Sequence, residues 1–242
     1  MSEARPAFYA LAPGSWRDYV TLVHPPYTLW HLSYVVIGAA LAPRFHAALL
    51  GWTLLAFFLA MGVGAHALDE LRGRPLQTLI PERTLVALAT TSIAAAAAIG
   101  IIVAVRRDLW LLVFVAAGSA LVVAYNLELF GGALHGDPWF SLGWGAFPVL
   151  TGYFASAHTL RGPALLAALF AALFSRAQRV LSTPVREIRR RTRNVSGRIE
   201  RRDGTVEPVD AHSIAGPPEL ALQTLSAAVV ALALALLLLR VT

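Results

Sequence analysis

Apolar residues along this chain occur in long runs that are separated by short polar segments. Most of these runs contain about twenty residues, which as a helix is enough to cross the hydrocarbon core of a bilayer. No alternation of apolar and polar residues over about ten positions, the pattern of a membrane barrel, is visible. The sequence therefore predicts an all-α, polytopic membrane bundle with about seven spans: 28–43, 46–68, 84–105, 109–127, 138–157, 162–180 and 219–240.

Composition supports a membrane protein and excludes several kinds of chemistry. Hydrophobic residues make up 57% of the 242 residues and charged residues only 14%, whereas soluble domains carry about 25% charged residues. The chain has no cysteine, which excludes disulfides, thiolate nucleophiles and cysteine metal sites. We expect one transmembrane helical domain over residues 1–242, without a separate soluble domain.

The distribution of basic residues predicts the orientation. All twenty are arginine. With seven spans, fifteen of them lie on the side of the N-terminus and five on the opposite side. By the positive-inside rule, we expect a cytoplasmic N-terminus in a bacterial or archaeal cytoplasmic membrane.

One long connection, 181–218, is expected to be a cytoplasmic, arginine-rich loop. Ser182-Thr183-Pro184 has the pattern of a new helix start, and Asp203-Gly204 that of a turn. Between them, the basic run from Arg186 to Arg202 is expected to contact anionic membrane lipids. Binding to nucleic acid is not expected, because the run lacks aromatic residues on which bases stack.

The densest group of chemically useful residues follows the second apolar run. On a helix, His66, Asp69 and Glu70 share one face, and an imidazole with two carboxylates could hold Mg²⁺ together with phosphate oxygens. Arg72 and Arg74 follow, and guanidinium groups match phosphate geometry. The competing interpretation is a helix end whose charges lie at head-group level.

Two further groups are expected on the same side of the membrane. Tyr125 and Glu128 end the fourth run, and Glu128 is either a catalytic acid or an interfacial one paired with an arginine. Arg176 and Arg179 end the sixth run, three positions apart. They could neutralise a diphosphate, or their side chains could extend to lipid head groups.

This layout resembles the UbiA superfamily of intramembrane prenyltransferases over most of the chain. In that family an acidic motif ends the second span and is followed by an Arg-Pro pair. Here Asp69 and Glu70 stand in the acidic region, and Arg74-Pro75 is similar to the pair. The resemblance implies transfer of an isoprenoid group from a polyprenyl diphosphate, assisted by Mg²⁺.

The chain also departs from the family pattern. The second Asp-rich motif is missing, because Ser175 to Arg193 supplies arginine where the family has aspartate, and seven spans replace the usual nine. The resemblance implies a divergent, shortened member, with His66, Asp69 and Glu70 as metal ligands and Asp69, Glu70 and Glu128 as catalytic acids. The diphosphate is then expected to contact a set of arginines and one tyrosine: Arg72, Arg74, Arg176, Arg179 and Tyr125.

Two alternatives to this function remain. An intramembrane terpene cyclase requires the same ionisation of a diphosphate but no acceptor. A non-catalytic membrane protein that binds lipid or supports a partner could keep the fold without the reaction. The apolar spans, with Phe57, Phe58, Trp110 and Phe114 as expected lining residues, would exclude water from a carbocation.

Overall fold

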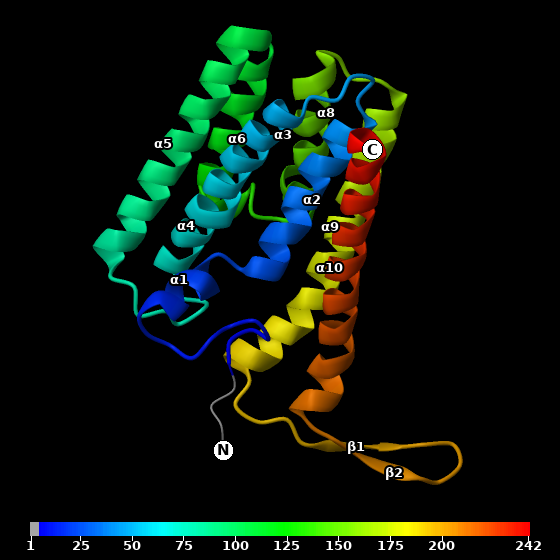
Figure 1. Cartoon of the computed structure of the whole chain (residues 1–242). Coiled ribbons are helices and arrows are strands. Elements are labelled where there is room, and N and C mark those ends of the chain that lie inside the picture. Colours follow the sequence, from blue (N-terminus) through cyan, green and yellow to red (C-terminus); the bar gives the residue numbers. More distant parts are fainter. Residues whose placement is uncertain (1–4) are drawn as a thin grey trace.

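The computed structural model describes residues 5–242 and shows a bundle of helices with a small two-stranded hairpin at one end (Figure 1). Helical segments occupy all seven apolar runs. Four of them are continuous α-helices: α2 (Pro25–Leu41), α5 (Glu82–Arg107), α6 (Leu111–Asn126) and α10 (Ala211–Val241). A fifth, α9 (Gly162–Arg191), is also continuous, and a short helix α1 (Trp16–Leu22) precedes the bundle.

The two remaining segments are helices with π-helical interruptions. The first consists of α3 (Ala47–Phe57), η1 (Phe58–Ala65) and α4 (His66–Leu71), and the second of α7 (Asp137–Phe140), η3 (Ser141–Ala146) and α8 (Phe147–Ala157). A short 3₁₀ turn, η2 (Phe130–Gly132), lies between α6 and α7. π-Helical turns of this kind occur frequently at functional sites.

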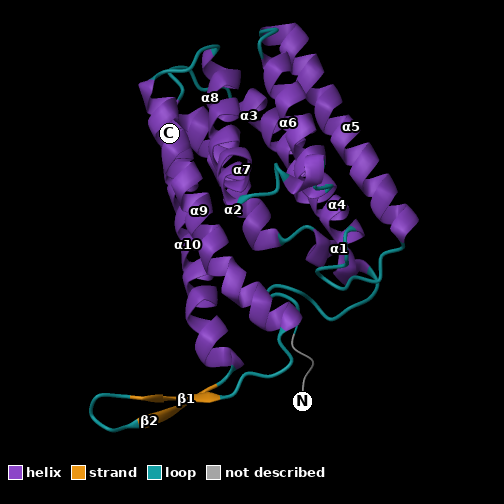
Figure 2. Ribbon diagram, turned by 180° about the vertical axis from the view of Figure 1, so that it is seen from behind, coloured by secondary structure: helices purple, strands orange, loops and turns teal. Residues whose placement is uncertain are grey.

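Helix α2 lies in the interior and contacts both α8 and α10 closely. A Cβ added to Gly38 would overlap the backbone carbonyl of Val149, and one added to Gly152 would overlap that of Val35. Small residues permit such close approach of helices within a bilayer. Trp30 on α2 is fully buried. The core therefore lies around α2, with α5 and α6 together on one side and α9 and α10 together on the other (Figures 1 and 2).

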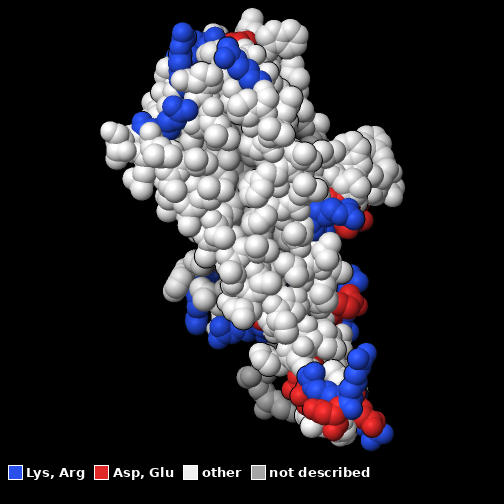
Figure 3. All heavy atoms as spheres, turned by 90° about the vertical axis from the view of Figure 1, so that its right-hand side faces the viewer, with Lys and Arg blue, Asp and Glu red and all other residues white. Residues whose placement is uncertain are grey.

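Four helices among the described residues are long and apolar enough to cross a membrane, namely Ala47–Leu71, Glu82–Arg107, Gly162–Arg191 and Ala211–Val241. On the face shown in Figure 3, arginines gather at one end and mixed charges at the other, with a wide uncharged zone between them. These observations support an all-α protein that is integrated in a membrane.

The expectation of a loop over 181–218 is wrong for most of its length. Helix α9 continues through Pro184 to Arg191, and the hydroxyl groups of Ser182 and Thr183 donate to the carbonyl oxygen of Arg179 instead of starting a new helix. A proline removes only one backbone donor, and a long helix can continue across it when neighbouring groups compensate.

The rest of this segment also has regular structure. Strands β1 (Gly197–Glu200) and β2 (Val206–Val209) pair antiparallel, and the predicted turn at Asp203-Gly204 connects them. Asp210 then caps α10 through a capping box with Ser213. The hairpin extends away from the bundle (Figure 1). We call this end of the molecule, which also carries α1, α4 and the N-terminal segment, the polar end.

Candidate functional site

The acidic residue Glu70 holds a loop at the polar end. Its buried carboxylate accepts hydrogen bonds from the backbone N–H of Leu76 (2.9 Å) and of Thr78 (2.8 Å), and from the Thr78 hydroxyl (2.9 Å). Arg74 holds the same loop, because its guanidinium donates to the carbonyl oxygens of Thr78 and Ile80. Both side chains are thus engaged within the protein and not directed toward a ligand.

Arg72 and Glu128 connect α4 to the end of α6. The Arg72 guanidinium donates to the Leu127 carbonyl oxygen (2.6 Å) and pairs with the Glu128 carboxylate at 3.1 Å. The side chains are 46% and 41% exposed, so this pair lies at the surface. It matches the interpretation of Glu128 as an interfacial acid paired with an arginine.

The expected metal triplet is not assembled. Glu70 faces the loop, whereas the His66 imidazole bonds the Gly62 carbonyl oxygen through Nδ1 (3.0 Å) and stacks on His24 with ring centroids 4.0 Å apart. Within residues 5–242, no group of three or more His, Asp and Glu side chains is arranged to hold a metal ion. The helical spacing of His66, Asp69 and Glu70 predicted that the three side chains share one face. The Glu70 carboxylate instead accepts hydrogen bonds from the loop after α4.

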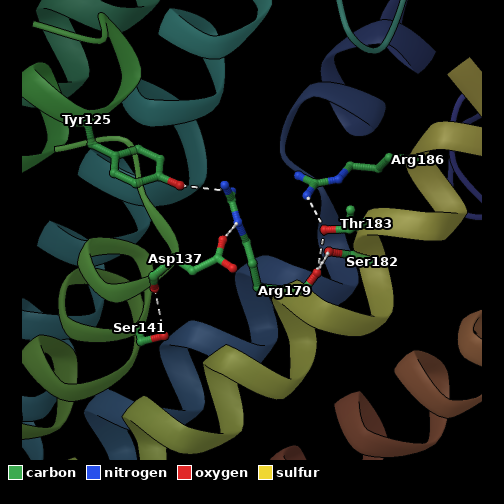
Figure 4. A network of polar contacts seen from close by, with 7 residues as sticks. All are labelled: Tyr125, Asp137, Ser141, Arg179, Ser182, Thr183 and Arg186. Atoms are coloured by element: carbon green, nitrogen blue, oxygen red, sulfur yellow. Dashed lines mark hydrogen bonds and ion pairs between the residues drawn. The ribbon is translucent and has the colours of Figure 1, made fainter. Parts of the chain in front are cut away.

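Arg179 on α9 is brought together with Tyr125, the residue with which the resemblance predicted that it shares a diphosphate. Its Nε donates to the Asp137 carboxylate and one terminal nitrogen donates to the Tyr125 hydroxyl, both at 2.9 Å (Figure 4). The guanidinium also lies 5.3 Å from the centre of the Phe140 ring. Arg176, by contrast, is exposed on the bundle surface, which fits the lipid-facing interpretation.

Two arginines that sequence analysis assigned to lipid lie in this site instead. Arg186 and Arg190 follow Arg179 by seven and eleven positions, a spacing that places all three on one side of α9. In Figure 4 the Arg186 guanidinium extends back along α9 toward the space that Arg179 occupies. The charges of Arg186 and Arg190 act on the Asp69 carboxyl, which is largely buried. We call Arg179, Arg186 and Arg190 the arginine cluster.

Within residues 5–242, the arginine cluster carries an excess of positive charge. Arg179 is neutralised by Asp137, whereas neither Arg186 nor Arg190 forms an ion pair in this part of the chain, and the charge of Asp69 acts on Arg186. Excess charge in a partly buried site is costly unless a counter-ion balances it. The cluster is therefore suited to bind an anion, and phosphate matches guanidinium geometry best. The helical spacing of 179, 186 and 190 could have indicated this if α9 had been predicted at its full length.

The N-terminal segment covers this cluster. Arg190 donates from Nε to the Pro6 carbonyl oxygen (3.2 Å), and the Tyr9 hydroxyl bonds Nδ1 of His24 at 2.7 Å. Burial is the main cause that lowers the pKa of His24 well below its ordinary value and raises the pKa of Tyr9. The Nε2 atom of His24 is buried and has no hydrogen-bond partner among residues 5–242. Sequence analysis did not predict this packing.

An apolar cavity of about 110 Å³ lies within the bundle. Its walls come from α3 and η1, α5, α6, and η3 with α8. Of the aromatic residues expected to line such a cavity, Phe57 and Phe114 do so, whereas Trp110 is exposed on the surface. Phe58 is not among the lining residues.

The cavity and the cluster are joined through aromatic rings. Trp144 lines the cavity, and its ring lies 4.3 Å from that of Tyr125, whose hydroxyl accepts from Arg179. Phe140, beneath the Arg179 guanidinium, stacks on Trp144. The site thus combines an apolar chamber with a cationic end, which is suited to an amphiphile with an anionic head.

Three of the six remaining arginines of the basic run form ion pairs within the protein. Arg189 forms a partly buried pair with Glu219 at 2.6 Å, Arg201 pairs with Glu207 and Arg191 with Glu187. These contacts satisfy part of the charge that the sequence suggested would face anionic lipids.

No protein-family model matches this chain, and neither a curated protein nor a solved structure is significantly similar to it.

Proposed function

We propose that this protein is a UbiA-like intramembrane prenyltransferase, with seven spans and a cytoplasmic N-terminus, that transfers an isoprenoid group from a polyprenyl diphosphate. The observation that carries this proposal is the apolar cavity whose end meets the arginine cluster through Trp144 and Tyr125. A prenyl diphosphate has the same division, with an apolar chain and an anionic head.

Arg186 and Arg190 would bind the diphosphate oxygens, while Asp137 and Tyr125 hold Arg179 in position beside them. The bond between the allylic carbon and oxygen breaks, and its electron pair leaves with the diphosphate. The guanidinium groups stabilise the charge that develops on the leaving oxygen. Of the carboxylates predicted as metal ligands, Asp69 is the one that the site offers to Mg²⁺, which commonly takes one or two carboxylates together with phosphate oxygens.

The aromatic residues between the cluster and the cavity would stabilise the allylic cation. The faces of Trp144, Tyr125 and Phe140 are close to one another, and aromatic faces attract cations, Trp most strongly. The cation then bonds to a nucleophilic atom of the acceptor, and the proton that the acceptor loses passes to the released diphosphate. The apolar walls would keep water from competing.

Ligand binding tests the proposal. We would measure binding of geranylgeranyl diphosphate to the purified protein with and without Mg²⁺, for the wild type, Arg186→Gln and Arg190→Gln. Arg191→Gln is the matched control, since Arg191 is the next residue on α9 but is 77% exposed. Each cluster substitution should weaken binding about tenfold or more, because a hydrogen bond between charged groups contributes about 1.5–3 kcal/mol. Absence of binding by the wild type, or equal binding by all variants, would contradict the proposal.

Analysis of the products separates the two enzymatic alternatives from each other. A terpene cyclase would release a cyclic hydrocarbon without any added acceptor, whereas a transferase would consume the diphosphate only when an acceptor is present. A protein that binds the diphosphate in a cluster-dependent way but forms neither product would be a lipid-binding protein.

A further inference from the structure

Helix α1 turns its polar residues toward the protein and its aromatic residues outward. The spacing of Trp16, Tyr19 and Val20 places them on one side of the helix. All three side chains are exposed, Trp16 by 65%. Asp18 and Thr21, on the opposite side, are buried. This arrangement is the reverse of a surface helix in water, whose apolar side faces the core.

Hydrogen bonds fix the orientation of α1. The Asp18 carboxylate accepts from the backbone N–H of Gly14 (2.9 Å) and from that of Leu79 (3.0 Å). The Thr21 hydroxyl accepts from the backbone N–H of Leu11 at 3.0 Å. A rotation that buried the aromatic residues would remove the acceptors of these backbone donors, which is costly. The aromatic side of α1 is therefore held outward.

The exposed side of α1 is continuous with that of α5, a helix that is long and apolar enough to cross a membrane. Leu79, whose N–H donates to Asp18, has a side chain that is 70% exposed. Helix α5 begins three residues later at Glu82, and Val86 in its first turns is also exposed. Figure 1 shows α1 at the polar end, next to α4. Exposed apolar side chains thus continue from a membrane-length helix to α1.

We propose that the aromatic side of α1 lies in the head-group region of the membrane, with lipid as its partner. Several apolar side chains exposed together mark an interaction surface, whereas single ones do not. Trp and Tyr are enriched at this depth, because their rings join an apolar body to a polar group. Arg17, also exposed on α1, can extend to the lipid phosphates. Helix α1 is then an interfacial anchor for the N-terminal segment and for the loop after α4.

Single cysteines in the full-length protein test this position, because the chain has no cysteine of its own. A fluorescent label would be attached at Tyr19→Cys, at Thr205→Cys in the hairpin turn and at Ala95→Cys near the middle of α5. The three native residues are exposed, so these substitutions should not disturb folding. Each labelled protein would be placed as a single copy in phosphatidylcholine nanodiscs. The lipid would carry a nitroxide quencher either near the head group or deep in the acyl chain, and iodide would be the aqueous quencher.

The label at residue 19 should lose most of its fluorescence to the shallow nitroxide, and little to the deep nitroxide or to iodide. The label at residue 205 should respond to iodide alone. The label at residue 95 should respond most to the deep nitroxide, as a position in the middle of a membrane-spanning helix requires.

Three results would overturn the proposal. Equal quenching by iodide at residues 19 and 205 would mean that α1 faces water. Protection of residue 19 from all three quenchers would mean that another part of the chain covers the aromatic side. Strongest quenching of residue 19 by the deep nitroxide would place α1 in the hydrocarbon core. None of these results depends on the diphosphate site, because no ligand is added.

Discussion

At the scale of single residues, Glu70 illustrates how an apparent catalytic acid can be a structural one. It is fully buried, and its two oxygens accept three hydrogen bonds from the loop that follows α4. A carboxylate that accepts several such bonds fixes the loop conformation, and removing it leaves buried donors unpaired. Its neighbour Asp69 is the acid on whose carboxyl the charges of Arg186 and Arg190 act.

We expect Glu70→Ala to lower the stability of the protein by about 3 kcal/mol or more, because two buried backbone N–H groups lose their acceptor. Thermal unfolding in detergent measures this effect. Glu128→Gln is the control, since that residue forms an exposed pair worth about 0–1 kcal/mol. Equal stability of the two variants would show that Glu70 does not hold the loop.

The buried histidine His24 predicts a dependence of stability on pH. It contacts Tyr9 and His66, and Arg186 and Arg190 act on it from α9. Burial lowers its pKa in the folded state, so below its ordinary value near 6.5 the unfolded chain binds a proton that the folded protein does not. The contribution of His24 to the free energy of unfolding is therefore complete above pH 6.5. It decreases as the pH falls, by at most about 1.4 kcal/mol per pH unit.

His24→Asn tests this contribution, because asparagine can keep the bond to Tyr9 without titrating. Unfolding midpoints would be measured between pH 7.5 and 5. The variant should lose less stability over this range than the wild type. An identical pH profile would mean that His24 is not responsible.

At the scale of elements, the contact of α2 with α8 depends on two glycines. A Cβ at Gly152 would overlap the backbone carbonyl of Val35, and backbone atoms cannot move aside as a flexible side chain can. The same holds for Gly38 against Val149. The two helices therefore approach each other through their backbones, which fixes the position of α2 in the core.

Gly152→Ala should destabilise the protein by about 1–3 kcal/mol or more through overpacking. Gly51→Ala on α3 serves as the control, because nothing lies within 4 Å of a Cβ at that position. That substitution should be neutral or stabilising by up to about 1 kcal/mol, since alanine favours a helix. Chemical unfolding in mixed micelles distinguishes the two, and equal effects would contradict the close contact.

At the scale of the whole molecule, the proposed topology places the polar end in the cytoplasm. Seven spans put the hairpin turn at residue 205 and the α5–α6 connection at residue 108 on opposite sides of the membrane. The chain contains no cysteine. Labelling of a single introduced cysteine therefore shows on which side of the membrane that position lies, because no other thiol reacts.

In intact cells, a cysteine at Thr205 should be protected from a membrane-impermeant maleimide, and one at Asp108 should react. Both should react after the membrane is permeabilised. Labelling of both positions in intact cells would contradict the seven-span topology, and the reverse pattern would contradict its orientation.

The apolar runs alone predict a helical bundle that is integrated in a membrane. Long apolar runs can satisfy their backbone hydrogen bonds in a bilayer only as helices or closed barrels, and no alternating pattern was present. The sequence also predicted that Tyr125 and Arg179 belong to the site, since both end apolar runs on the same side. Their direct contact could not be predicted, because the order of the spans does not fix which helices pack together.

Which charged residues lie together at the polar end depends on contacts between distant segments. The sequence placed Glu70, Arg72 and Arg74 there, but hydrogen bonds to the following loop and to α6 occupy all three. It placed Arg186 and Arg190 among lipids, because they belong to a basic run beyond the sixth apolar segment, whereas α9 continues to Arg191. Local patterns determine where helices form, whereas the partner of a charged side chain depends on contacts between segments that are distant in the chain.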